Sequence, residues 1–401
     1  MPDVFPLPAG FRAAGITCGV KDPSATRKDI ALFVSERPCA AAGVFTTNLV
    51  CGAPVKVSRE RLPRATARAI VINSGNANAC TGEQGLTDAK AMAAAVAREL
   101  RCPADDVLVA STGVIGRFLP MDRISAGITK AVSALDAKPQ ALMDAATAMM
   151  TTDTVPKLST REITLNGKPI RVTGVCKGAA MIAPSMATML CAILTDAALP
   201  HGEAQDLIRI AVRDSFNCIS VDGHESTSDS VFLLANGAAG VGPESDASLW
   251  QLLQTAVNEV AQELAMAIIK DAEGAHHFVQ LDVTGCRTRD EAFRIAKAVA
   301  DSPLVKTAIC GADPNWGRIV SAAGYAGVPL QEQDISLAMN GFPLYEAGRP
   351  LPFDAATVSM SLRKNREVHI DLKLDHGDQR VRFWTSDLTK EYVELNADYT
   401  T

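Results

Sequence analysis

One threonine in the middle of the chain, Thr188, has the surroundings expected of a nucleophile. It follows the small residue Ala187 and precedes an apolar run that carries no charge until Asp196. One interpretation is structural, since a β-branched residue suits the entry to a buried strand at 189–195, and residue type by itself favours it. The other is chemical: the hydroxyl attacks the carbonyl of Ala187, the chain breaks, and the new amino terminus makes Thr188 both nucleophile and base.

Three features of the preceding residues favour the chemical interpretation. The small side chain of Ala187 leaves its carbonyl open to attack from the side. Pro184 fixes φ and disfavours helix, so irregular or extended backbone, able to hold strain, is expected at 181–187. The run Gly178-Ala179-Ala180 allows close approach of other backbone, and Lys177 supplies the nearby charge.

A second candidate group lies after a predicted strand at 107–110. This strand runs into Ser111-Thr112-Gly113, where backbone N–H groups and a hydroxyl can converge on an anion. Most such sequences are simple turns. If Thr188 is a nucleophile, however, an oxyanion needs stabilising, and Thr112 with Gly113 is the best donor pair in the chain.

Composition limits the classes of protein to consider. The chain has 401 residues, 47% of them hydrophobic, which is typical of a compact α/β enzyme with a well-buried core. A net charge of −6 without a basic stripe argues against nucleic acid as a partner. The ten cysteines form no C-x-x-C pair, so neither a zinc ribbon nor a redox dithiol is predicted. Cysteines spread singly in this way predict a protein of the reducing cytoplasm. Neither a signal peptide nor a membrane span is predicted.

The elements around these residues can be predicted in outline. Single helices are expected from Thr87 to Leu100 and over 124–150, and a hairpin over 161–175 with its turn at Asn166-Gly167. Amide and hydroxyl residues at 73–82 predict tight turns, with a pocket wall as the alternative.

Three further groups have a structural and a chemical interpretation. The loop 217–230 holds acids and a histidine; metal binding is conceivable there, but its spacing matches no zinc motif, and a solvated loop is predicted. Glu273, after a helix over 248–269, is a surface residue at a helix end or reaches a site. Cys310 would need a nearby histidine to act as a nucleophile, and the sequence positions of the six histidines suggest none.

Six segments together carry a family resemblance. The chain resembles ArgJ-type glutamate N-acetyltransferases, also called ornithine acetyltransferases, of arginine biosynthesis, essentially from end to end. The resemblance rests on the segments 111–116, 151–154, 177–190, 270–274, 311–318 and 386–401. The block around Ala187-Thr188 is the most specific of them.

The resemblance implies an α/β fold of the layered sandwich type. The protein would use an amino-terminal nucleophile as the amino-terminal nucleophile hydrolases do, but with another topology. The resemblance also implies self-cleavage between Ala187 and Thr188 into an α chain, 1–187, and a β chain, 188–401. Thr188 would accept the acetyl group of N-acetylornithine as an ester and pass it to glutamate in a ping-pong cycle. It further implies a cytoplasmic α2β2 assembly without cofactor or metal, with acetyl-CoA as a possible co-substrate.

Residue roles follow from the same resemblance. Thr112 and Gly113 match the oxyanion-hole pair. The residues matching substrate contacts are Thr151, Lys177, Thr188, Glu273, Asn396 and Thr401. Lys177 suits an α-carboxylate and Glu273 a cationic amine. Whether Thr151 or Thr152 faces the ligand stays open, and the segment 222–229 departs from the family pattern.

Two other functions share these features. A self-processed amidase or aminopeptidase would use water in place of glutamate as the acceptor. A non-catalytic relative would bind amino acids and show no cleavage.

Overall fold

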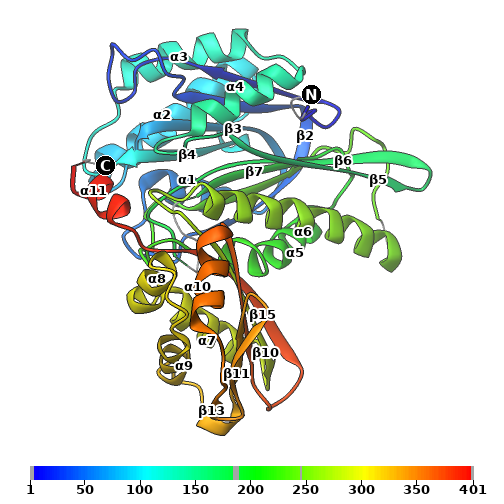
Figure 1. Cartoon of the computed structure of the whole chain (residues 1–401). Coiled ribbons are helices and arrows are strands. Elements are labelled where there is room, and N and C mark those ends of the chain that lie inside the picture. The colour runs from blue at the N-terminus through cyan, green and yellow to red at the C-terminus, as the bar shows by residue number, and fades with distance from the viewer. Residues whose placement is uncertain (1–3, 184–188, 244–245, 399–401) are drawn as a thin grey trace.

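Two β-sheets form the framework of the molecule. The computed structural model describes residues 4–183, 189–243 and 246–398. The first sheet has the order β4-β3-β2-β9-β7-β6-β5, with β1 added on β2, and the second has the order β13-β12-β11-β14-β10-β15-β8. Figure 1 shows the first sheet in the upper lobe with helices above and below it, and the second sheet in the lower lobe. The protein is therefore a layered α/β structure, as predicted.

The strands of the first sheet are β1 Phe11–Ile16, β2 Ile30–Phe45, β3 Arg64–Asn76, β4 Val107–Val114, β5 Lys157–Leu165, β6 Lys168–Lys177, β7 Leu190–Thr195 and β9 Ser230–Ala235. Those of the second are β8 Ile219–Ser220, β10 Phe278–Cys286, β11 Ser336–Met339, β12 Phe342–Glu346, β13 Arg349–Pro350, β14 Glu367–Lys373 and β15 Gln379–Ser386. The helices are α1 Ala53–Arg61, α2 Gly82–Leu100, α3 Met121–Ser133, α4 Pro139–Met149, α5 His201–Arg213, α6 Ala247–Lys270, α7 Arg289–Ala300, α8 Pro303–Cys310, α9 Trp316–Gly324, α10 Ala355–Lys364 and α11 Lys390–Asp398.

Strand β7 shows why the first sheet needs cover on both faces. Its sequence, LCAILT, is uncharged, and every residue of it is buried. Cys191 and Ile193 join the core cluster that includes α5 and α6. Leu190, Ala192 and Leu194 join the cluster that includes α4. An uncharged run without polar alternation is typical of a strand that is buried from both sides.

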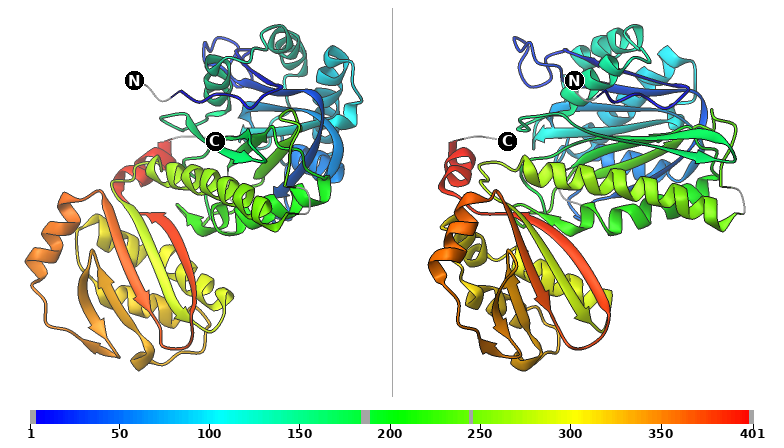
Figure 2. Two further views of the ribbon diagram at one scale, coloured as in Figure 1. Left: turned by 90° about the vertical axis from the view of Figure 1, so that its right-hand side faces the viewer. Right: turned by 45° about the vertical axis from the view of Figure 1, so that its right-hand side comes forward.

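The order of the first sheet interleaves distant parts of the sequence. β9 pairs antiparallel with β2, and β7 pairs parallel with β9 and antiparallel with β6. Two strands from beyond residue 188 therefore lie between strands from before it. Figure 2 shows the two lobes of the molecule from two further sides.

Helix α6 connects the two lobes. Asp246 caps it by accepting hydrogen bonds from the backbone N–H groups of Ser248 and Leu249. Its apolar face packs on β5 and β6 within a core cluster that continues into β10 and β15 of the second sheet. The helix ends at Lys270, which brings Glu273 to the boundary between the lobes. No helix among the described residues is long and apolar enough to span a membrane.

Several predicted elements need correction. The helix expected over 124–150 is two helices, α3 and α4, because Pro139 lacks an N–H donor and starts a new helix at its first turn. Thr87 does not cap α2; the helix starts at Gly82, and the Thr87 hydroxyl donates to the carbonyl of Glu83 within it. The hairpin with its turn at Asn166-Gly167 is confirmed as β5–β6.

A buried lysine in the lower lobe makes a test of this packing possible. The ammonium of Lys306, in α8, donates to Thr385 Oγ1 at 2.9 Å and to the carbonyl of Ser386. Burial lowers the pKa of Lys306 from 10.5 to about 8. Between these two values the unfolded chain binds a proton that the folded chain has lost.

We expect the free energy of unfolding to rise with pH between about 8 and 10.5, and Lys306→Met to lack this rise. Urea unfolding at a series of pH values measures it. Lys364→Met, on the exposed end of α10, should keep the wild-type pH dependence. An unchanged slope in Lys306→Met would contradict the burial of a titrating amine there.

Candidate active site

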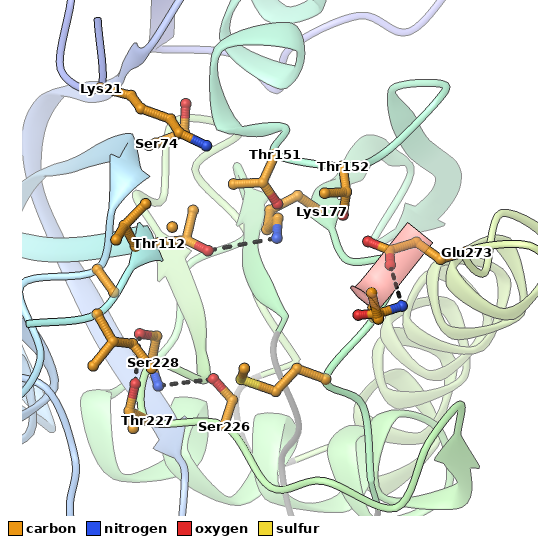
Figure 3. A pocket seen from close by; sticks show the side chains of 18 of the residues that line it. Lys21, Ser74, Thr112, Thr151, Thr152, Lys177, Ser226, Thr227, Ser228 and Glu273 are labelled. Atoms are coloured by element: carbon orange, nitrogen blue, oxygen red, sulfur yellow. Dashed lines mark hydrogen bonds between the residues drawn. The ribbon is translucent and has the colours of Figure 1, made fainter. Parts of the chain in front are cut away.

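A pocket of about 340 Å³ lies where the end of the first sheet meets α6 and α11. Six of the residues predicted to form the site line it: Thr112, Gly113, Thr151, Lys177, Glu273 and Asn396. Figure 3 shows Thr112 and Lys177 side by side, with Glu273 across from Ser74 and Lys21. Residues far apart in the sequence are thus brought together around one pocket.

Three predicted residues, Ala187, Thr188 and Thr401, lie outside the described residues. Met181, before the undescribed segment 184–188, lines the pocket. Ala183 and Met189 on either side of that segment are buried. The described residues just before the segment 184–188 therefore include one that lines this pocket.

The parallel strands β3 and β4 position Thr112 and Gly113, the two residues predicted as the oxyanion-hole pair. Their register places Ser74 beside Thr112 and Gly75 beside Gly113, at the ends of both strands. Gly113 has φ +129°, and a Cβ there would lie 2.4 Å from the carbonyl carbon of Gly75. Glycine is required at this position because both its conformation and its close approach to β3 exclude a side chain.

Lys177, at the end of β6, places a buried cation beside these strands. Its side chain is 2% exposed, and its Nζ lies 3.5 Å from Thr112 Oγ1 and 3.9 Å from a carboxylate oxygen of Asp153. Burial lowers the pKa of Lys177, while the charge of Asp153 opposes that shift. An anionic ligand group at this ammonium would likewise favour its charged form.

Asp153 is part of a buried ion-pair cluster with Lys177, Lys157 and Asp271. The Nζ of Lys157 lies 2.7 Å from Asp153 and 2.6 Å from Asp271. Burial opposes ionisation of Asp153, yet the charges of Lys177 and Lys157 hold its pKa below the ordinary value. Asp153 also accepts the backbone N–H of Gly178 at 2.6 Å, which fixes the chain directly after Lys177.

The opposite wall carries a negative charge. The Asn396 side-chain amide donates to Glu273 Oε2 at 3.1 Å, which joins α11 to the end of α6. Both Thr151 and Thr152 line the pocket, so the question of which threonine faces a ligand stays open. Arg27 donates to the carbonyl of Thr151 at 2.7 Å and positions this segment.

The loop 217–230 was predicted to be solvated, and this prediction is wrong. Ser226, Ser228 and Asp229 are buried, and Asp222 and His224 line the pocket. The loop is held in place because its polar side chains bond to neighbouring backbone in place of water.

Asp222 connects this loop to two other walls of the pocket. It accepts hydrogen bonds from the backbone N–H groups of Met181 at 2.7 Å and Ile182 at 2.9 Å, and from the hydroxyl of Tyr392 at 3.2 Å. The carboxylate of Asp222 therefore links its own loop to two other parts of the chain: the segment before the expected cleavage point and helix α11.

Asp229 lies beside the far end of the undescribed segment. It is fully buried and accepts the backbone N–H of Met189 at 2.9 Å. Burial raises its pKa well above the ordinary value, and the nearby Lys177 opposes that shift.

Sequence reasoning missed several residues of the pocket, among them Ser74, Gly75, Asp222 and Tyr392. The density of amide and hydroxyl residues at 73–82 was the available signal, and the pocket-wall alternative given for that stretch is the one that the structure supports. Asp222 and Tyr392 carry no signal of their own, because their importance depends on contacts between segments 170 residues apart.

Together these groups suit acyl chemistry on a small charged molecule. A hydroxyl with adjacent backbone N–H groups can stabilise an oxyanion, a buried ammonium can bind a carboxylate, and a carboxylate opposite can bind an amine. The fold and the pocket thus define a layered α/β protein with a site for amino-acid-like ligands.

The sequence matches the ArgJ family over residues 12–401, and the chain belongs to that family. It is 44% identical over 397 residues to the arginine biosynthesis bifunctional protein ArgJ of Rhodopirellula baltica, covering 98% of this chain and 96% of that protein. It is 44% identical over 403 residues to the protein of the same name from Thermotoga neapolitana, covering 98% and 100%.

Two solved structures are also similar. The crystal structure of ArgJ from Bacillus halodurans has 35% identity and a TM-score of 0.50, covering 52% of this chain and 98% of that one. The ornithine acetyltransferase of Mycobacterium tuberculosis, solved with ornithine, has 39% identity and a TM-score of 0.41, covering 47% and 97%.

We expect Gly113→Ala to lower the melting temperature strongly, because the new methyl group meets the backbone of Gly75. Gly116→Ala is the matched control: its φ is also positive, at +78°, but no atom lies within 4 Å of the added Cβ. Thermal unfolding of both variants measures the difference. Equal losses would show that backbone conformation, and not the contact between β3 and β4, requires glycine.

Proposed function

We propose that the protein is a glutamate N-acetyltransferase that moves an acetyl group from N-acetylornithine to glutamate in arginine biosynthesis. The observation that carries the proposal is the convergence of Thr112, Gly113, Lys177 and Glu273 on one pocket in a chain of the ArgJ family. The names of the relatives and the ornithine bound in the Mycobacterium tuberculosis enzyme support it.

The reaction proceeds in two acyl transfers. The hydroxyl of Thr188 attacks the acetyl carbonyl of N-acetylornithine, and its proton passes to the amine of Thr188, which in turn protonates the departing amine of ornithine. Glutamate then attacks the acetyl ester through its amine, and N-acetylglutamate leaves as Thr188 regains its proton. Each half-reaction breaks one bond to the acetyl carbon and forms another, so no redox partner is needed.

The pocket residues have separate tasks in these steps. Lys177 binds the α-carboxylate, a group that donor and acceptor share. Glu273 binds the side-chain ammonium of ornithine, supported by Asn396. Thr112 and Gly113 stabilise the oxyanion of both tetrahedral intermediates. Thr151 and Thr401 complete the contacts to substrate.

The mechanism requires the chain to cleave itself between Ala187 and Thr188, which frees the amine of Thr188. The arrangement of the first sheet is compatible with a cut at this point. β7 and β9 of the β chain, 188–401, hydrogen-bond to β2 and β6 of the α chain, 1–187. The two chains would therefore stay together after cleavage.

The proposal also covers the subunit assembly, the cellular location and the acetyl donors of the enzyme. We propose an α2β2 assembly in the cytoplasm, in which the acetyl-transfer reaction uses neither a metal nor an organic cofactor and acetyl-CoA is an additional acetyl donor. The bifunctional names of the relatives support the last point.

The decisive experiment measures N-acetylglutamate formed from N-acetylornithine and glutamate, beside a second reaction with acetyl-CoA as donor. We expect active protein to run as two fragments on a denaturing gel, the second beginning at Thr188, and Thr188→Ala to give one uncut, inactive chain. Ornithine release without N-acetylglutamate would indicate the amidase with water as acceptor. A single uncut wild-type chain with full activity would contradict the mechanism.

We expect Thr112→Val to reduce kcat about a hundredfold and to slow self-cleavage as well, because the variant keeps the shape of the side chain but loses a polar group at the oxyanion. Single-turnover measurements with N-acetylornithine separate this step from product release. Thr152→Val, on the same pocket wall, provides a comparison at the position whose role is open. Unchanged turnover in Thr112→Val would remove that hydroxyl from the oxyanion assignment.

A further inference from the structure

Beside the active-site pocket, three metal-ligating side chains from separate segments meet. One donor atom each of His276, Cys310 and Asp387 lies within 4.8 Å of the other two. His276 follows the Glu273 segment, Cys310 ends α8, and Asp387 follows β15. From this geometry we propose that the three residues bind one zinc-type transition-metal ion.

The set of donors determines the class of metal. A thiolate and an imidazole favour zinc and its neighbours in the transition series over calcium and magnesium, which prefer oxygen ligands. Zinc bonds of about 2.0–2.3 Å in a tetrahedron place donor atoms roughly 3.5 Å apart. The side chain of His276 is 59% exposed and free to turn, so a movement of about 1 Å completes the geometry.

A second carboxylate lies next to one of the three ligands. Glu391, in the first turn of α11, has its Oε2 3.4 Å from Nε2 of His276. The fourth position of a tetrahedral site would be filled by water or by another side chain. The exposure of Glu391 leaves the site open to ions from solvent.

The buried member of the set is already held in position. Asp387 accepts the backbone N–H groups of His276 at 2.9 Å and His277 at 3.0 Å. Its other oxygen lies 2.8 Å from Nδ1 of His277, and Nε2 of that ring contacts the carbonyl of Leu362 at 3.2 Å. A carboxylate oxygen has two lone pairs, so Asp387 retains capacity for a metal. Such outer contacts orient metal ligands.

The same three residues do not form a cysteine nucleophile. Burial and the charge of Asp387 raise the pKa of the Cys310 thiol, whereas a catalytic cysteine needs a lowered pKa. A bound cation would reverse this, because the metal stabilises the thiolate directly. The expectation that no histidine lies near Cys310 is corrected here: His276 lies near it, 34 residues away in the sequence.

The proposed metal site lies between two segments that form walls of the active-site pocket. His276 lies three residues after Glu273, and Glu391 precedes Tyr392 on α11, whose Asn396 bonds to Glu273. The hydroxyl of Thr389 also donates to the carbonyl of Gly274. A metal bound by His276 and Asp387 would therefore join the residues just before α11 to the Glu273 segment.

The test uses the full-length protein, treated with a chelator and then dialysed, with Zn²⁺ and Co²⁺ as probes. We expect isothermal titration to give one Zn²⁺ per chain, and Co²⁺ to give the absorption of a tetrahedral thiolate complex. Cys310→Ser and His276→Gln should each weaken Zn²⁺ binding at least about tenfold, since they remove direct ligands. Both side chains are at least partly exposed, so both variants should fold.

Matched substitutions elsewhere separate this site from general affinity of the chain for metals. Cys102→Ser and His201→Gln change the same residue types at other positions and should bind Zn²⁺ as the wild type does. Binding that Cys310→Ser and His276→Gln leave unchanged, or no binding by the wild type, would overturn the proposal. Because metal binding is measured without substrate, its failure would leave the proposed acetyl transfer untouched.

Discussion

The buried ammonium of Lys177 is the charge on which the site depends. It is 2% exposed, and the carboxylate of Asp153 beside it is itself held by Lys157 and the backbone of Gly178. A buried cation without such partners is strongly disfavoured, and removing one member of a buried pair costs roughly 3–5 kcal/mol. The ion-pair cluster therefore positions the end of β6, and with it the start of the segment that leads to Thr188.

This arrangement also accounts for the shape of the pocket. With Lys177 fixed, the ends of β3 and β4 supply Thr112 and Gly113 on one side. The Glu273–Asn396 pair supplies negative charge on the other. In the proposed function, a small molecule that carries a carboxylate and an amine would meet complementary charge at both ends, and its acyl group would lie near Thr112 and Gly113. Electrostatic complementarity of this kind selects ligands more than it adds affinity.

The interleaved first sheet has a different consequence. β7 is bonded to β6 on one side and to β9 on the other, and β9 in turn to β2. A cut near residue 188 would leave every one of these ladders in place, because none of the strands contains the cut and two of the ladders join the parts of the chain on either side of it. Cleavage could therefore change the chemistry of one residue at small cost to the fold. The second lobe adds α11 to the pocket through Asp222, which bonds both Met181 and Tyr392.

The sequence by itself determined those features that depend on local pattern or on a specific segment. Three local features could be predicted directly: the uncharged run of β7, the turn at Asn166-Gly167 and the family resemblance at 177–190. The sequence, with this resemblance, also named six of the residues that line the pocket.

The tertiary structure decided which distant segments of the chain come into contact. No sequence pattern pairs Asp222 with Tyr392, Lys177 with Asp153, or His276 with Cys310. Their proximity follows from strand order and helix packing, which a one-dimensional pattern does not contain. The same reason explains why much of the loop 217–230 is buried: its polar composition predicts exposure, but backbone groups of other segments bond to the side chains of Asp222 and Asp229 in place of water.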